Sequence, residues 1–169
     1  RYWKGYEPNT PPPEKRTENI LKLKEIGILP EIRVDPIIPF VTDTEAEITT
    51  LFKELKGLEV KKVTLSYLHL RPAIQKQLMK ELSPLHQKLI DSCFKTQEWK
   101  EVGSSTRTKL LPKKIREKGY QRINRIAGRF GIIASVCQCK NPDLRGDLCS
   151  SGRVKIVTSK RTARQLPLF

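Results

Sequence analysis

Segments that alternate between helical and extended patterns constrain the fold of this chain most strongly. Alternation of apolar and polar residues predicts strands over 31–36, 60–70 and 131–139. Apolar residues at helical spacing predict helices over 14–26, 42–57, 72–82, 84–94 and 113–129. Helices that alternate with strands imply an α/β fold, in which parallel strands are joined by right-handed crossovers.

The first two predicted strands carry polar residues on one face. These residues are Arg33 and Asp35 in one strand, and Thr64 and Ser66 in the other. A parallel sheet that is covered by helices on both faces needs apolar residues on both faces. The polar face therefore indicates either a barrel whose interior holds a ligand or an edge position with one wet face.

The charge of the chain indicates a polyanionic partner, and nucleic acid is the first candidate. The formal net charge is +15 and the isoelectric point is about 9.9. Between residues 107 and 129 the basic residues are opposed only by Glu117. We expect this stretch to neutralise backbone phosphates in a salt-dependent manner. The predicted DNA-binding residues are Lys113, Lys114, Arg116, Arg122, Arg125 and Arg129.

Three of the four cysteines are candidates for a metal site. Cys137 and Cys139 are two residues apart at a predicted strand end, and Cys149 follows after turn-forming residues. Three converging thiolates favour Zn²⁺ or an iron–sulfur cluster, although a closed zinc site needs a fourth ligand. The alternative is three ordinary thiols. Cys93 is predicted to lie in the core, and His69 and His86 lack ligand-like spacing, so both are expected to be structural or surface residues.

The chain ends in a basic tail, residues 153–169, which we separate from a domain that spans 1–152. Its last residues, Gln165-Leu166-Pro167-Leu168-Phe169, resemble the peptide by which bacterial replication and repair proteins hold the sliding clamp. In such a peptide Gln165 would hydrogen-bond at a pocket rim, and Leu166, Leu168 and Phe169 would fill apolar sockets. The alternative is an apolar chain end that folds onto its own domain.

A longer motif resembles a known family. It comprises Glu-Pro-Asn-Thr-Pro-Pro-Pro-Glu-Lys-Arg at 7–16, the segment 20–28, Arg-Val-Asp-Pro-Ile-Ile-Pro at 33–39 and Thr42-Asp43. Together these segments resemble the second half of a radical S-adenosylmethionine barrel, and most closely the spore photoproduct lyase-like or DNA repair photolyase-like family. The resemblance implies the C-terminal half of a partial (β/α)6 TIM-like barrel with parallel strands.

The resemblance also implies a chemistry. Such enzymes bind a [4Fe–4S] cluster through Cys-x-x-x-Cys-x-x-Cys, receive electrons from a flavodoxin or ferredoxin, and cleave S-adenosylmethionine to a 5′-deoxyadenosyl radical that acts on damaged thymines. This sequence contains no Cys-x-x-x-Cys-x-x-Cys. Because it begins at Arg1 without an initiator Met, we expect a fragment that is inactive alone and whose cluster ligands lie mostly outside it.

Position by position, the resemblance implies cofactor-binding roles for Arg33, Asp35, Ile37, Ile38 and Ser66. Three of these residues have alternatives. Arg33 and Asp35 would also suit a structural ion pair, and Ser66 would also satisfy buried backbone. A cysteine near the barrel mouth could return a hydrogen atom to a product radical, as in photoproduct lyases.

The sequence therefore predicts part of a radical S-adenosylmethionine enzyme of DNA repair. The alternative is a non-enzymatic, basic three-cysteine zinc module that binds nucleic acid and the clamp. A radical enzyme for a small metabolite or tRNA would leave the clamp peptide unexplained. No apolar run approaches the roughly 18 residues of a membrane span, and no secretory signal opens the chain, so we expect a cytoplasmic protein without a membrane partner.

Overall fold

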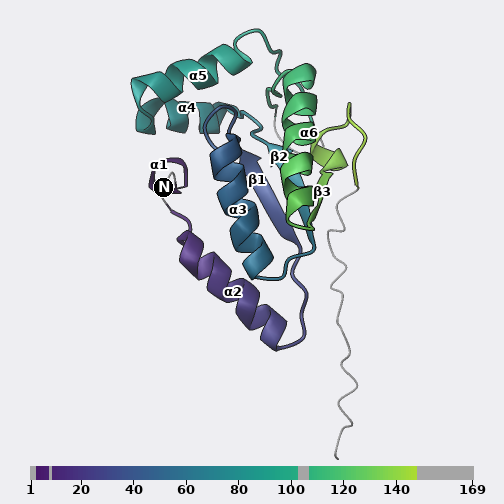
Figure 1. Cartoon of the computed structure of the whole chain (residues 1–169). Helices are drawn as coiled ribbons and strands as arrows, with labels where there is room; N and C mark the ends of the chain where they lie inside the picture. The colour runs from purple at the N-terminus through teal and green to yellow at the C-terminus, as the bar shows by residue number, and fades with distance from the viewer. Residues whose placement is uncertain (1–2, 8, 103–106, 148–169) are drawn as a thin grey trace, which may run out of the picture.

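A computed structural model of the chain describes residues 3–7, 9–102 and 107–147. Its elements, in chain order, are α1 (Trp3–Tyr6), α2 (Pro13–Glu25), β1 (Ile32–Ile37), α3 (Glu45–Gly57), β2 (Lys62–Tyr67), α4 (Pro72–Glu81), α5 (Pro84–Phe94), α6 (Lys113–Arg129), β3 (Ile133–Val136) and the 3-10 turn η1 (Gln138–Lys140). Figure 1 shows α3 and α6 packed against the sheet, with α4 and α5 at one end of it and α2 at the other.

Within the described residues the sheet has three parallel strands in the order β1-β2-β3. Arg33 is the register partner of Thr64, and Thr64 is the partner of Ser135. The parallel strands confirm the α/β class, and their register places the polar residues of neighbouring strands side by side. The sheet is open, so closure into a barrel stays a prediction.

Local sequence signals explain several helix starts. Thr44 precedes α3, and its hydroxyl accepts a hydrogen bond from the backbone N–H of Glu47 at 3.3 Å. Ser83 plays the same role before α5, where it accepts from the N–H of His86 at 3.4 Å. Proline occupies the first turn of α2, α4 and α5, where a missing N–H costs nothing.

The second and third strands are shorter than the sequence predicts. Leu70 leaves the sheet to form an antiparallel bridge with Lys109. After Val136 the chain turns into η1, and Cys137 pairs with Asp147 in an isolated bridge. Leu70 and Cys137 thus each pair with a segment outside the parallel sheet, although the Cys137 N–H still donates to the Leu65 carbonyl at 3.0 Å.

The core lies between one face of the sheet and the helices α3 and α6. Val63 and Leu65 of β2 are fully buried on this face, beneath Phe52 of α3 and Ile123 of α6. Burial of such side chains stabilises the fold by about 1.5–3 kcal/mol each. None of the helices in the described ranges is long and apolar enough to cross a membrane.

A buried polar cluster joins α6 to the sheet. The Tyr67 hydroxyl donates to Asp43 Oδ2 at 2.8 Å, and Arg122 Nη2 donates to the same oxygen at 3.0 Å. The Tyr67 backbone N–H donates to the Tyr120 hydroxyl at 3.0 Å. Burial and the Asp43 carboxylate raise the Tyr67 pKa far above its ordinary value, so the phenol stays a neutral donor.

The position of Tyr67 depends on a glycine in α6. A Cβ added at Gly119 would overlap the Tyr67 hydroxyl and ring, whereas a Cβ at Gly128 on the same helix would meet nothing within 4 Å. Gly119 is therefore required by close packing, and Gly128 is not.

This difference gives a matched pair of substitutions. We expect Gly119→Ala to lower the free energy of unfolding by roughly 1–3 kcal/mol, because the added methyl overpacks the core. Gly128→Ala should raise it by about 0.5–1 kcal/mol, because alanine favours helix more than glycine does. Urea unfolding followed by circular dichroism measures both, and equal effects of the two substitutions would contradict the packing argument.

Candidate functional site

A pocket of about 400 Å³ opens where the carboxyl ends of β1 and β2 meet. Ligands of open α/β sheets bind at this edge, because the loops that leave parallel strands converge there. The lining residues come from the strand ends, from α4, from the N-terminal segment and from η1. They are Glu7, Asp35, Pro36, Ile38, Leu68, His69, Arg71, Ile74, Leu78 and Lys140.

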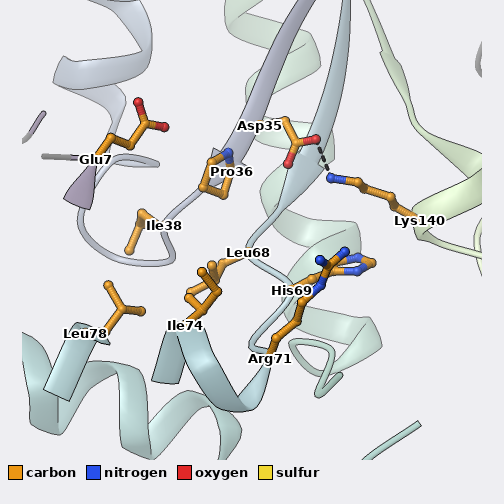
Figure 2. Close-up of a pocket in the computed structure, with 10 residues that line it drawn as sticks. All are labelled: Glu7, Asp35, Pro36, Ile38, Leu68, His69, Arg71, Ile74, Leu78 and Lys140. Carbon is orange, nitrogen blue, oxygen red and sulfur yellow. Dashed lines mark hydrogen bonds and ion pairs between the residues drawn. The ribbon is translucent and has the colours of Figure 1, made fainter. Parts of the chain in front are cut away.

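The pocket has an apolar side and a charged side (Figure 2). Ile38, Leu68, Ile74 and Leu78 form the apolar side. The charged side combines the cations of Arg71 and Lys140 with the carboxylate of Asp35. The carboxylate of Glu7, which pairs with Arg16, lies on the other side, near Ile38 (Figure 2). This arrangement suits a ligand that carries an apolar ring and charges of both signs.

Asp35 is the most constrained charge in the pocket. Its Oδ2 lies 2.5 Å from the Lys140 amine and 3.4 Å from the Arg33 guanidinium. In the described part of the chain, both ion pairs end on Oδ2, and no hydrogen bond engages Oδ1. The carboxylate is thus oriented by two cations and retains acceptor capacity.

His69 lies in the pocket as a neutral imidazole at physiological pH. Burial and the neighbouring Lys140 cation lower its pKa to about 4, although hydrogen bonding to the Lys140 backbone and the Asp35 charge oppose the shift. A neutral imidazole carries one donor and one acceptor nitrogen. His69 can therefore hydrogen-bond a ligand without adding charge to the pocket.

Of the five residues predicted to bind a cofactor, two line the pocket and three do not. Asp35 and Ile38 line the pocket. Arg33 shares the polar sheet face but directs its guanidinium to Asp35 and to Cys137 Sγ, 3.4 Å away. Ile37 is 1% exposed in the core, because the register shifts between Val34 and Ile37. Ser66 is fully buried, and its hydroxyl donates to the Tyr67 carbonyl at 3.3 Å.

Four polar lining residues were not among the sequence predictions for the pocket: Glu7, His69, Arg71 and Lys140. His69 and Arg71 follow β2 directly, so the rule that sites form at carboxyl strand ends was a usable signal for them. Glu7 and Lys140 are distant in sequence and meet the pocket only through the tertiary fold.

Two of the three predicted metal ligands, Cys137 and Cys139, lie next to pocket residues, since Arg33, which pairs with Asp35, contacts Cys137, and Cys139 precedes Lys140. The sequence predicts that Cys137 and Cys139 share one face of a strand. Their sulfurs do lie 2.8 Å apart, but Cys139 lies on η1, so the turn and not strand alternation brings them together. Cys149 lies outside the described residues. Within the described ranges no group of three or more Cys, His, Asp or Glu side chains could hold a metal ion.

The basic helix separates into exposed and paired residues. Lys114 and Arg125 are exposed. Lys113 is exposed and lies 3.8 Å from Glu117. Arg129 is exposed and lies 3.3 Å from Glu45. Arg122 is bound to Asp43 and is 41% exposed.

Arg116 differs from the other predicted DNA-binding residues. Its side chain is 3% exposed, and its guanidinium forms a fork with Asp143 at 2.6 and 3.0 Å. It is turned to the interior and not to a phosphate. The predicted clamp-binding residues Gln165, Leu166, Leu168 and Phe169 lie outside the described residues.

No protein-family model, no curated protein and no solved structure matches this chain. The resemblance of its sequence to radical S-adenosylmethionine enzymes therefore stays a prediction, and the pocket has to be interpreted from its own chemistry.

The buried neutral state of His69 has a measurable consequence for stability. Between pH 6.5 and about pH 4 the unfolded chain binds a proton at this imidazole and the folded chain does not. We therefore expect the contribution of His69 to lower the free energy of unfolding as the pH falls through this range. Urea unfolding at pH 7 and pH 5 should show a shallower loss in His69→Asn than in the unsubstituted chain. Equal losses, or an NMR titration of His69 near 6.5, would contradict the assignment.

Proposed function

We propose that this chain is the S-adenosylmethionine-binding part of a radical enzyme that acts on DNA. The observation that carries the proposal is the pocket at the carboxyl edge of the parallel sheet, with an apolar side opposite charges of both signs. The sequence resemblance of residues 33–39 supports it, because Asp35, Pro36 and Ile38 of that segment line the pocket.

The chemistry of the pocket fits the parts of this ligand. S-adenosylmethionine has an adenine ring, ribose hydroxyls, a sulfonium, an ammonium and a carboxylate. Ile38, Leu68 and the α4 side chains Ile74 and Leu78 offer an apolar surface for the ring. Arg71 offers a cation for the carboxylate, since a guanidinium matches its planar geometry.

Asp35 is the residue that suits the hydroxyls or the ammonium. Lys140 and Arg33 hold its Oδ2, so the carboxylate is positioned before a ligand arrives. Such preorganisation lowers the entropic cost of binding. When bound, S-adenosylmethionine supplies a carbon–sulfur bond whose reductive cleavage yields a carbon radical.

The [4Fe–4S] cluster of such enzymes does not fit the described residues. They contain no group of three suitable ligands, and the whole sequence lacks Cys-x-x-x-Cys-x-x-Cys. The proposal therefore assigns ligand binding and orientation to this chain and derives no electron-transfer step from it.

Contact with DNA is assigned to one exposed stripe of α6. Lys114, Lys118, Arg125 and Arg129 lie three to four residues or whole turns apart, so their side chains share one side of the helix. All four are exposed, whereas Ile123 and Ile126 occupy the buried side. Such a stripe binds phosphates without reading base sequence.

Binding of S-adenosylmethionine tests the pocket. By isothermal titration calorimetry we expect the 169-residue chain to bind it, and Asp35→Asn to weaken binding about tenfold or more, since a hydrogen bond to a charged group contributes about 1.5–3 kcal/mol. Glu18→Gln is the control, because Glu18 also pairs with a lysine but lies on α2 away from the pocket. Absence of binding, or equal affinities of the two variants, would refute the assignment.

Binding of DNA tests the α6 stripe separately. Lys114→Glu together with Lys118→Glu should weaken binding to a duplex and flatten the dependence of log affinity on log salt by roughly 2, because two phosphate contacts are lost. The matched control replaces Lys76 and Lys80, which are exposed at the same spacing on α4. Fluorescence anisotropy at several salt concentrations measures both, and a similar loss in the control would indicate nonspecific charge effects.

A further inference from the structure

Cys137 and Cys139 form a cysteine pair whose sulfurs are in contact at the end of the sheet. Their Sγ atoms lie 2.8 Å apart, which exceeds the length of a disulfide bond, about 2.05 Å, by roughly 0.75 Å. The structure therefore holds the pair as two thiols. A small rotation of one side chain is enough to bring the sulfurs to bonding distance.

The two sulfurs differ in their access to solvent. Cys137 is fully buried, whereas Cys139 is exposed. A reagent that arrives from solvent therefore meets Cys139 first and can reach Cys137 only through it. Cys93 is a different kind of thiol, because it lies in the apolar core, where burial raises its pKa and keeps it protonated.

The backbone fixes the inner sulfur more firmly than the outer one. The Cys137 N–H donates to the Leu65 carbonyl of β2 at 3.0 Å, and the Cys137 carbonyl accepts from the Asn141 side-chain amide at 2.9 Å. Cys139 lies on the three-residue turn η1, which the Lys140 N–H closes onto the Cys137 carbonyl at 3.3 Å. The turn thus holds an exposed thiol over a thiol that the sheet keeps in place.

A cation next to the inner sulfur suits the charge that this sulfur needs in order to react. Arg33 Nη2 lies 3.4 Å from Cys137 Sγ, and the same guanidinium is oriented by Asp35. The thiolate is the form of cysteine that attacks a disulfide, and a nearby guanidinium stabilises its negative charge. Arg33 would have this positioning role, in place of the cofactor contact that the sequence predicts.

From these contacts we propose that Cys137 and Cys139 are a redox-active dithiol that exchanges with disulfides of low molecular weight, such as glutathione disulfide. The Cys139 thiolate attacks one sulfur of that disulfide, forms a mixed disulfide and releases one thiolate. The Cys137 thiolate then attacks the Cys139 sulfur, forms the Cys137–Cys139 bond and releases the second thiolate. Two electrons pass from the cysteine pair to the small disulfide, and the two released thiolates take up the two protons that the cysteines lose.

The experiment uses the full chain, reduced and treated with a chelator, and glutathione disulfide as the probe. Remaining thiols are alkylated, and tryptic peptides are weighed by mass spectrometry. Trypsin cleaves after Arg129 and after Lys140, so both cysteines lie in the single peptide 130–140. We expect this peptide to become lighter by two hydrogens and to carry no alkyl group. A bond to Cys149 would instead join it to the peptide 146–153.

Substitutions separate the two steps. Cys137→Ser should stop at the mixed disulfide and retain one glutathione on Cys139, because the resolving sulfur is missing. Cys139→Ser should lose the reaction at this peptide, because Cys137 is buried. Cys93→Ala and Cys149→Ser are the controls with one thiol fewer, and both should form the bond as the unsubstituted chain does. Circular dichroism checks folding, and Cys139→Ser carries the test if Cys137→Ser fails to fold.

Four outcomes would overturn the proposal. The peptide 130–140 could remain alkylated at both cysteines, the unsubstituted chain could keep glutathione on Cys139 without resolving it, the bond could form to Cys149, or Cys139→Ser could react as fast as the unsubstituted chain. None of these outcomes depends on the binding of S-adenosylmethionine or DNA, so this inference and the proposed function stand or fall separately.

Discussion

The buried guanidinium of Arg116 is the contact on which the pocket side of the molecule depends. It donates to the Leu111 carbonyl and to the Asn141 side chain, each at 2.8 Å, and forms a fork with Asp143. The Arg116 side chain is 3% exposed and that of Asp143 is 39% exposed, so removal of Asp143 would leave the buried guanidinium without its charge partner. The Arg116 guanidinium also holds the pKa of Asp143 below its ordinary value, so the pair persists at neutral pH. This fork fixes α6 to the segment after β3, and that segment supplies Lys140 and both cysteines.

Much of the fold follows from local patterns in the sequence, and the exceptions have tertiary causes. The apolar spacing predicts α6 over 113–129, as observed, and predicts α3 over 42–57, whose start lies a few residues before the observed cap at Thr44. The early ends of β2 and β3 were not predictable, because Leu70 and Cys137 find partners in segments about 39 and 10 residues further along the chain. Closure into a barrel would need more strands than the three in the described residues.

The candidate site was predictable where alternation decides which way a side chain points. Asp35 lines the pocket, in line with the strand face that alternation assigns to it. Ile37, whose predicted cofactor contact rests on the family resemblance, is buried in the core after the register shift that follows Val34. In the basic helix α6, helical spacing predicts burial better than charge does. Arg116 lies four residues before Tyr120 and seven before Ile123, so helical spacing alone assigns it to the buried side. Its charge suggested a phosphate contact, but its position in the helix was the better guide.

The polar face of the sheet joins the pocket and the cysteine pair into one connected unit. Arg33 lies beside both Asp35 and Cys137, and Lys140, which pairs with Asp35, belongs to the same short turn as Cys139. The Asn141 side chain connects Arg116 to this turn, since its oxygen accepts from Arg116 and its amide N–H donates to the Cys137 carbonyl. A charge that enters the pocket therefore acts on groups that also orient the sulfurs. A ligand that contacts Asp35 would therefore also meet the guanidinium that lies 3.4 Å from Cys137 Sγ.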